Sequence, residues 1–293
     1  MPEQSWTIAS LLKWTTGFLE SKGIDSPRLD AELLLAEALG CSRVELYMEY
    51  NREPDERSRD RFRDLVRRRA SREPVQYILG RAEFYALEFE VTPEVLIPRP
   101  ETEYLVAEAV GVLSGGGSVE GGGLAADVGT GSGNAAVSLA VNRPGARVIG
   151  TDSSPAALAV ARRNVARHGV AGRVELREGD LLAPLGPEAG GFDCVMSNPP
   201  YVAEGELIGL MPEVRDHEPR CALLAGPDGL AVARRLLEEA PAYLCPGGWL
   251  ILELGAGQAA AAQRIAACTG RYGEVRSVKD QQGIERILAL RKG

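Results

Sequence analysis

Apolar side chains recur three or four positions apart in the N-terminal part of the chain, which is the spacing of one face of a helix. They do so over residues 11–19 and again over residues 29–39, and a glycine follows each set as a stop signal. A third helix is expected over residues 54–71. We therefore predict an N-terminal helical domain over residues 1–80.

Eight arginines lie between positions 57 and 72, against two acids, Asp60 and Asp64. We interpret this run as a solvated face of the third helix. The alternative is a docking surface for an acidic partner protein or RNA.

Short β-like segments replace the helical pattern over residues 74–98. Residues 83–87 and 89–92 predict a β-hairpin that links two domains over residues 81–100. The early acid Glu101, which follows two nearby prolines, marks the start of the next helix. The glycine run at residues 115–123 is interpreted as a flexible loop.

Strand-like and helix-like segments alternate after residue 123. Seven strands are expected, over residues 124–128, 147–151, 174–177, 192–197, 249–254, 274–278 and 286–290. A short turn-like segment that contains Gly283 separates the last two strands. This alternation predicts an α/β fold for residues 101–293, with a parallel sheet that an antiparallel pair closes at one edge.

The turn after the first of these strands is rich in glycine. It reads Asp127, Val128, Gly129, Thr130, Gly131, Ser132, Gly133. Such a turn lets a nucleotide-like ligand approach the backbone at the carboxyl ends of parallel strands. Asn134 stands where the dinucleotide fingerprint G-x-G-x-x-G requires a glycine, and no G-K-[ST] sequence follows. The sequence therefore disfavours both NAD and a Walker phosphate loop.

Acidic side chains lie at the ends of the first three strands. Asp152 follows the second strand and can accept both hydroxyls of a ribose. Asp180 follows the third, where a carboxylate or a backbone amide can meet an adenine edge, and Asp127 favours a cationic ligand directly or through water. Each acid alone fits a helix cap equally well. Together they suit a positively charged cofactor with a ribose and no phosphates, which describes S-adenosylmethionine.

Asn198, Pro199, Pro200 and Tyr201 follow the fourth strand and predict chemistry on a planar nitrogen. The prolines lack N–H groups, keep their carbonyl acceptors and restrict the backbone. An incoming –NH2 group can donate one hydrogen to the Asn198 side chain and another to a backbone carbonyl, while Tyr201 offers a flat face to an amide or base. The alternative is a proline turn that merely ends the strand.

Composition argues against several other classes of function. The five cysteines are widely spaced without a C-x-x-C pair, and the two histidines, His168 and His217, have no ligand spacing. No disulfide framework, metal site or Ser-His-Asp triad is therefore expected. Residues 1–16 lack a signal-peptide pattern and the chain has no long apolar stretch, so we expect a cytoplasmic protein with no membrane partner.

The distribution of charge bears on the choice of partner. Residues 1–80 hold 13 basic and 14 acidic side chains, so the total charge of −8 divides into −1 for this part and −7 for the rest. A protein that grips duplex DNA through many phosphates normally shows a basic face. Stable DNA binding is not expected.

Several separate motifs together resemble the PrmC/HemK family, the glutamine methyltransferases of peptide chain release factors, which are class I S-adenosylmethionine-dependent methyltransferases. The motifs are P-V-Q-Y-I-L-G at residues 74–80, E-F-Y at 83–85, L-I-P-R-P-E-T-E at 96–103, the glycine-rich turn, S-N-P-P-Y at 197–201, E-P at 218–219 and A-L at 222–223. The resemblance covers nearly the whole chain.

The resemblance implies an N-terminal helical bundle, a linking hairpin and a seven-stranded Rossmann-like methyltransferase domain. The substrate would be the glutamine of the Gly-Gly-Gln loop in class 1 release factors, and we expect a monomer. Asn198 would touch both cofactor and glutamine, and Asn198 and Tyr201 would be the catalytic residues of a segment that cradles the amide. The cofactor would be held by Asp127, Gly129, Thr130, Gly131, Ser132, Gly133, Asp152, Asp180, Leu181 and Asn198. Family members often carry an aromatic residue at the position of Leu181.

Two rival functions stay open. An adenine amine in DNA or RNA is also a planar –NH2 group, and the same tetrapeptide serves adenine methyltransferases. The negative charge of residues 81–293 and the lack of an inserted target-recognition segment argue against that function. A non-catalytic cofactor-binding or ribosome-associated module would keep the fold, but the intact Asn198 and glycine-rich turn argue against it.

Overall fold

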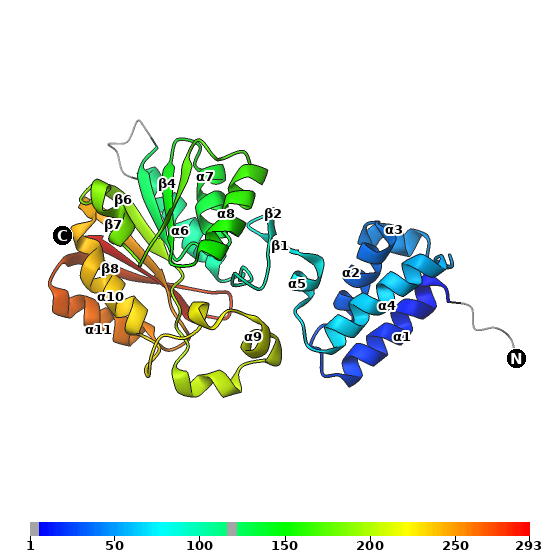
Figure 1. Ribbon diagram of the computed structural model, residues 1–293. Helices are drawn as coiled ribbons and strands as arrows, with labels where there is room; N and C mark the ends of the chain where they lie inside the picture. Colours follow the sequence, from blue (N-terminus) through cyan, green and yellow to red (C-terminus); the bar gives the residue numbers. More distant parts are fainter. Residues whose placement is uncertain (1–5, 116–121) are drawn as a thin grey trace, which may run out of the picture. The chain divides into compact units, whose positions relative to one another are not determined.

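The computed structural model describes residues 6–115 and 122–293, which form two compact units (Figure 1). The first unit contains the chain up to Gly80 together with Met211–His217, and the second contains Arg81–Leu210 and Glu218–Gly293. Most of the predicted glycine loop, residues 116–121, lies outside the described residues. The short segment Met211–His217 interrupts the second unit in sequence but belongs to the first by its contacts.

The first unit is a helical bundle. Its helices are α1 (Ile8–Ser21), α2 (Pro27–Leu39), α3 (Arg43–Met48), α4 (Glu56–Ala70), α5 (Val75–Leu79) and α9 (Pro212–His217). Local signals set their ends: the Thr7 hydroxyl caps α1 by accepting from the Ser10 N–H, and Gly40 ends α2 with a φ of 66°. Leu19 and Leu34 are fully buried between the helices. The three helices predicted for this part are all present.

The arginines of α4 mostly pair with carboxylates instead of forming a free basic face. At exposed positions this holds for Arg61, Arg63, Arg67 and Arg68. The Arg69 side chain is buried, and it lies 2.6 Å from the carboxylate of Asp30 on α2 and 2.9 Å from that of Glu213 on α9. This buried cluster ties three helices of the first unit together.

Strands β1 (Arg81–Phe84) and β2 (Leu87–Glu90) form the expected antiparallel hairpin. The predicted strand at residues 83–87 was wrong, because Tyr85 and Ala86 make the turn. Both have positive φ, 52° and 58°, a conformation that glycine and asparagine usually supply. The turn is held instead by the Tyr85 N–H, which donates to the Glu103 carboxylate at 2.8 Å.

Seven strands of the second unit form one sheet in the order β5-β4-β3-β6-β7-β9-β8. Their bounds are β3 (Leu124–Val128), β4 (Arg147–Asp152), β5 (Val174–Glu178), β6 (Phe192–Ser197), β7 (Leu244–Glu253), β8 (Tyr272–Lys279) and β9 (Glu285–Lys292). The first five strands in this order are parallel, and β9 runs antiparallel to both neighbours. The predicted α/β fold is confirmed. The strand order reverses between β3 and β6, which is where open sheets of this kind bind ligands.

Helices cover both faces of this sheet (Figure 1). One face packs on α6 (Thr102–Gly115), α7 (Asn134–Asn142) and α8 (Pro155–Arg167), and the other on α10 (Ala231–Glu239) and α11 (Ala259–Thr269). Successive residues of a strand point to opposite faces, and Ala125 and Ala126 of β3 accordingly belong to different cores. Within the described ranges, no helix has both the length and the apolar run that crossing a bilayer requires.

Candidate functional site

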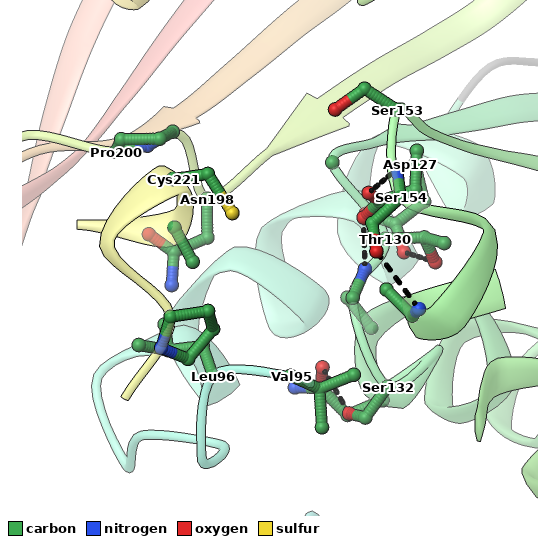
Figure 2. Close-up of a pocket in the computed structure, with 18 of the residues that line it drawn as sticks. Val95, Leu96, Asp127, Thr130, Ser132, Ser153, Ser154, Asn198, Pro200 and Cys221 are labelled. Carbon is green, nitrogen blue, oxygen red and sulfur yellow. Dashed lines mark hydrogen bonds between the residues drawn. The ribbon is translucent and has the colours of Figure 1, made fainter. Parts of the chain in front are cut away.

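A cavity of about 240 Å³ opens at the carboxyl ends of the central parallel strands. Its walls come from the turn after β3, the ends of β4 and β5, and the segment after β6. Figure 2 shows Asp127 and Thr130 on one side of this cavity and Asn198 and Pro200 on the other. The structure therefore brings together the glycine-rich turn and the tetrapeptide, which are far apart in the sequence.

The glycine-rich turn is anchored on the neighbouring strand. The backbone N–H groups of Gly129 and Thr130 both donate to the Thr151 carbonyl, at 2.8 and 2.9 Å. Gly133, with a φ of 78°, precedes α7, and a Cβ added there would lie 3.2 Å from the Cβ of Ala161 on α8. This glycine therefore permits close packing of two helices, whereas Cβ atoms added at Gly129 and Gly131 would meet nothing within 4 Å.

Asp127 lies beneath the turn and is 2% exposed. One carboxylate oxygen accepts from the Thr130 hydroxyl at 2.6 Å and from the Ala136 N–H at 3.1 Å. Burial raises the pKa of Asp127 to about 6, against the opposing effect of these hydrogen bonds. Asp127 therefore joins the turn to the start of α7 and also borders the cavity.

Asp152 ends β4 and holds the turn from the other side. Its two carboxylate oxygens accept from the backbone N–H groups of Gly131 and Ser154, both at 2.9 Å. The Ser154 hydroxyl in turn caps α8. Each carboxylate oxygen keeps a further acceptor position, so Asp152 can still bind hydroxyl groups in the cavity that it lines.

Asp180 and Leu181 lie at the end of the cavity next to β5. The Asp180 carboxylate is exposed and pairs with both terminal nitrogens of Arg235, at 3.2 and 2.8 Å, and this pairing lowers the pKa of Asp180. Leu181 has a φ of 45° and its carbonyl accepts from the Thr151 hydroxyl at 2.8 Å. Arg235, which the sequence analysis did not identify, thus occupies one side of the Asp180 carboxylate.

Asn198 follows β6 directly and is held by polar contacts on both sides. The preceding residue, Ser197, donates its hydroxyl to the Val128 carbonyl at 2.6 Å. The Asn198 Nδ2 donates to the Thr102 hydroxyl oxygen at 3.0 Å, and that hydroxyl donates to the Glu253 carboxylate at 2.7 Å. The Asn198 Oδ1 atom is buried and finds no hydrogen-bond partner within the described part of the chain.

Tyr201 is half-buried, and burial raises the pKa of its hydroxyl to about 12. Its backbone carbonyl accepts from the Gln258 side-chain amide at 2.9 Å. A Cβ at Gly229 would lie 2.4 Å from this carbonyl oxygen, so no other residue fits there without displacing the backbone. Gln258 and Gly229 therefore fix the tetrapeptide, and the sequence analysis identified neither.

The E-P and A-L motifs also have structural partners. Glu218 is buried and pairs with Arg99, while the Val202 N–H donates to the Leu223 carbonyl at 2.8 Å. The first contact joins the segment before α6 to the residue after α9, and the second holds the residue that follows the tetrapeptide. No group of three or more His, Cys, Asp or Glu side chains could hold a metal ion among the residues that the structure describes.

Comparison with known proteins gives two family matches and nearly full-length relatives. Residues 10–80 match the family described as PrmC N-terminal domain, and residues 125–217 match the one described as Methyltransferase domain. A release factor glutamine methyltransferase of Geobacter sulfurreducens is 46% identical over 288 residues, or 98% of each chain. One of Rhodopirellula baltica is 44% identical over 287 residues, which cover 98% of this chain and 97% of the other.

A solved structure extends the comparison to the fold. The methyltransferase of Pyrococcus furiosus has a TM-score of 0.51 and 23% identity, over 72% of this chain and 91% of its own. The predicted Rossmann-like methyltransferase fold is therefore confirmed. The likeness to these two relatives along nearly the whole chain favours methylation of a release-factor glutamine over methylation of adenine. The chain belongs to the family of release factor glutamine methyltransferases.

Proposed function

We propose that the cavity binds S-adenosylmethionine and that Asn198, Pro199, Pro200 and Tyr201 bind the glutamine side chain in the Gly-Gly-Gln loop of a class 1 release factor. The amide nitrogen of that glutamine receives the methyl group. The observation that carries this proposal is the buried Oδ1 atom of Asn198, which has no hydrogen-bond partner among the described residues. Buried acceptors are normally paired, so this atom calls for a donor from a ligand, and a primary amide supplies one.

The residues around the turn suit the cofactor. Asp152 is oriented by two backbone N–H groups and can accept the ribose hydroxyls, while Asp127 and Asp152 place negative charge near a sulfonium ion. The open space above Gly129 and Gly131 leaves room for the ligand. Thr130, Ser132 and Gly133 would shape this part of the site, and Asp180 and Leu181 would border the adenine.

A primary amide is a poor nucleophile because its nitrogen lone pair is delocalised into the carbonyl. S-adenosylmethionine supplies an electrophilic methyl group. The Asn198 Oδ1 and a backbone carbonyl of the tetrapeptide would accept hydrogen bonds from the two N–H groups of the glutamine amide. They would hold the amide nitrogen in line with the methyl group. Orientation of this kind can contribute about 7 to 11 kcal/mol in favourable cases. Tyr201, neutral at physiological pH, would pack its ring against the amide, and water can take the proton after transfer.

The proposal extends to the organisation of the protein. Residues 1–80 would form the helical domain, residues 81–100 the linker, and residues 101–293 the catalytic domain of a cytoplasmic monomer. The partner would be a release factor, with no stable DNA binding. The charge of −7 outside residues 1–80 supports a protein substrate over a nucleic acid.

Replacement of Asn198 tests the proposal. Asn198→Ala should lower methyl transfer to the release-factor glutamine by more than about a hundredfold, because it removes the acceptor that aligns the amide. Binding of S-adenosylhomocysteine, measured by calorimetry, should weaken by less than about tenfold, since most proposed cofactor contacts remain. Asn142→Ala is the matched control, because this asparagine bonds to the Ser138 carbonyl within α7.

The label must also appear at the expected place. Transfer of the labelled methyl group from the cofactor to the release factor should be lost when the glutamine of the Gly-Gly-Gln loop is replaced. Near-normal turnover by Asn198→Ala, or a label that goes to nucleic acid and not to the release factor, would contradict the proposed function.

A further inference from the structure

Three side chains from distant parts of the second unit form a buried chain of hydrogen bonds that ends at the substrate site. Glu253 is the last residue of β7, Thr102 is the first residue of α6, and Asn198 follows β6. Glu253 and Thr102 are 2% and 3% exposed. The Thr102 hydroxyl donates to Glu253 at 2.7 Å and accepts from Asn198 Nδ2 at 3.0 Å.

The chemistry of these groups gives the chain a direction. A hydroxyl has one hydrogen, and an ionised carboxylate can only accept. When Glu253 is ionised, the Thr102 hydrogen therefore points to Glu253, and the Thr102 oxygen can only accept from its other neighbour. Asn198 must then present its Nδ2 to Thr102. Its Oδ1 is left for a donor, which agrees with the absence of a partner for this atom among the residues that the structure describes.

We propose that Thr102 and Glu253 are positioning residues that fix which end of the Asn198 side-chain amide faces the substrate. The inference rests on the proposed function, because it assigns the Oδ1 acceptor to the glutamine amide. If the Asn198 amide were rotated by half a turn, an N–H donor would face the N–H bonds of the substrate. The Asn198 side chain would then repel the amide nitrogen of the substrate instead of holding it.

The protonation state of Glu253 controls the direction of this chain of hydrogen bonds. Burial, with a contribution from the nearby Glu101, raises the pKa of Glu253 to about 7. A protonated Glu253 can donate to Thr102, whose hydrogen is then free to point at Asn198 and favour the rotated amide. The ionisable groups that act on or respond to Glu253 are Glu101 and Arg99 before α6, Arg286 on β9, and Tyr201 after β6.

Substitutions at Thr102 test the positioning role. Thr102→Val keeps the shape but removes the hydroxyl, and kcat should fall about tenfold to a hundredfold. KM for the release factor and the Kd of S-adenosylhomocysteine should stay within about threefold of wild type, because neither partner relies on this hydroxyl for binding. Thr102→Ser restores the hydroxyl and should keep kcat within about threefold of wild type. Thr269→Val, which removes a hydroxyl at the end of α11, is the matched control.

Unchanged kcat in Thr102→Val would overturn the proposal. An equal loss in Thr102→Ser would do so as well, because it would assign the effect to the methyl group of Thr102. If Thr102→Val does not fold, the decision passes to Glu253→Gln, which keeps the size and one acceptor oxygen of the side chain but does not titrate.

The Glu253→Gln variant is tested by the pH dependence of single-turnover methylation. In the wild type the rate should rise with pH through the pKa of Glu253, about 7, and Glu253→Gln should lose this acidic limb. Retention of the limb in the variant, or its absence in the wild type, would overturn the proposal.

A measurement without turnover separates this inference from the proposed function. The side-chain 15N–1H resonances of Asn198 should titrate with the same midpoint in the wild type and stay constant in Glu253→Gln. If wild-type protein methylates no release-factor glutamine, the proposed function fails, whereas constant Asn198 resonances in the wild type refute the positioning role alone.

Discussion

The side-chain amide of Gln258 donates a hydrogen bond to the backbone carbonyl of Tyr201 at 2.9 Å, across 57 positions of sequence. The same side chain accepts from the Gly255 N–H at 2.9 Å. One glutamine thus joins the loop after β7 to the end of the Asn-Pro-Pro-Tyr segment. The contact fixes the position of the Tyr201 backbone carbonyl.

Gln258→Glu should lower methyl transfer by about tenfold, because a carboxylate of the same shape cannot donate to the Tyr201 carbonyl and places two acceptors against each other. Steady-state kinetics with a release factor would measure the effect. Gln263→Glu is a matched control on α11, the helix that follows Gln258, and its side-chain amide bonds to the Ser277 hydroxyl at 3.0 Å. Equal losses in the two variants would indicate a general effect on α11 and contradict the role of Gln258.

Asp152→Asn should raise the Kd of S-adenosylhomocysteine by about tenfold to a hundredfold, because an amide can accept only one of the two backbone N–H bonds that orient the carboxylate. Asp180→Asn should change the Kd by less than about threefold, since this carboxylate is exposed and its pair with Arg235 is screened by solvent. Calorimetric titration measures both. A larger rise in Kd for Asp180→Asn than for Asp152→Asn would contradict the proposal that Asp152 contributes more to cofactor binding.

The stability of Asp127→Asn relative to the wild type should increase as the pH rises. Burial places the folded-state pKa of Asp127 at about 6, above its ordinary value of 3.8. The folded wild type therefore binds the proton more tightly than the unfolded chain, and it loses stability as the pH rises from about 4 through about 6. Asparagine does not titrate and can accept the same hydrogen bonds from Thr130 and Ala136.

The stability difference between Asp127→Asn and the wild type should thus grow by about 2 to 3 kcal/mol between pH 4 and pH 7. Urea unfolding at several pH values, without cofactor, measures it. A constant difference would show that folding does not shift the pKa of Asp127, and a difference that falls with pH would show that the folded state stabilises the charged carboxylate.

Arg69→Met should destabilise the helical unit by about 3 to 5 kcal/mol, because it leaves the buried Asp30 carboxylate without its cation and leaves Glu213 with Arg72 alone. Arg67→Met removes an exposed i,i+3 pair with Asp64 on the same helix and should cost less than about 1 kcal/mol. Thermal unfolding followed by circular dichroism compares the two variants. Similar shifts in Tm would contradict a special role for the buried cluster.

The periodic pattern of the chain predicted most of its regular elements. Segments 124–128 and 192–197 were predicted with the bounds that β3 and β6 have, because alternation and strand-end signals are local properties of the sequence. The strand-end acids and glycines predicted a cofactor site at the carboxyl ends of the parallel strands, and the structure has a cavity there. The hairpin turn at Tyr85 and Ala86 escaped prediction, because a contact with the distant Glu103 replaces the usual turn residues.

The sequence by itself thus determined the fold class, the site of the cavity and, through its motifs, the family. The tertiary structure alone decided which side chains hold the site in place. The tetrapeptide is contacted from distant parts of the sequence by Gln258, Gly229 and Thr102, and Glu253 in turn holds Thr102. No local spacing encodes such contacts, because the direction of a buried hydrogen bond depends on which donors and acceptors the packed elements bring within about 3 Å of each other.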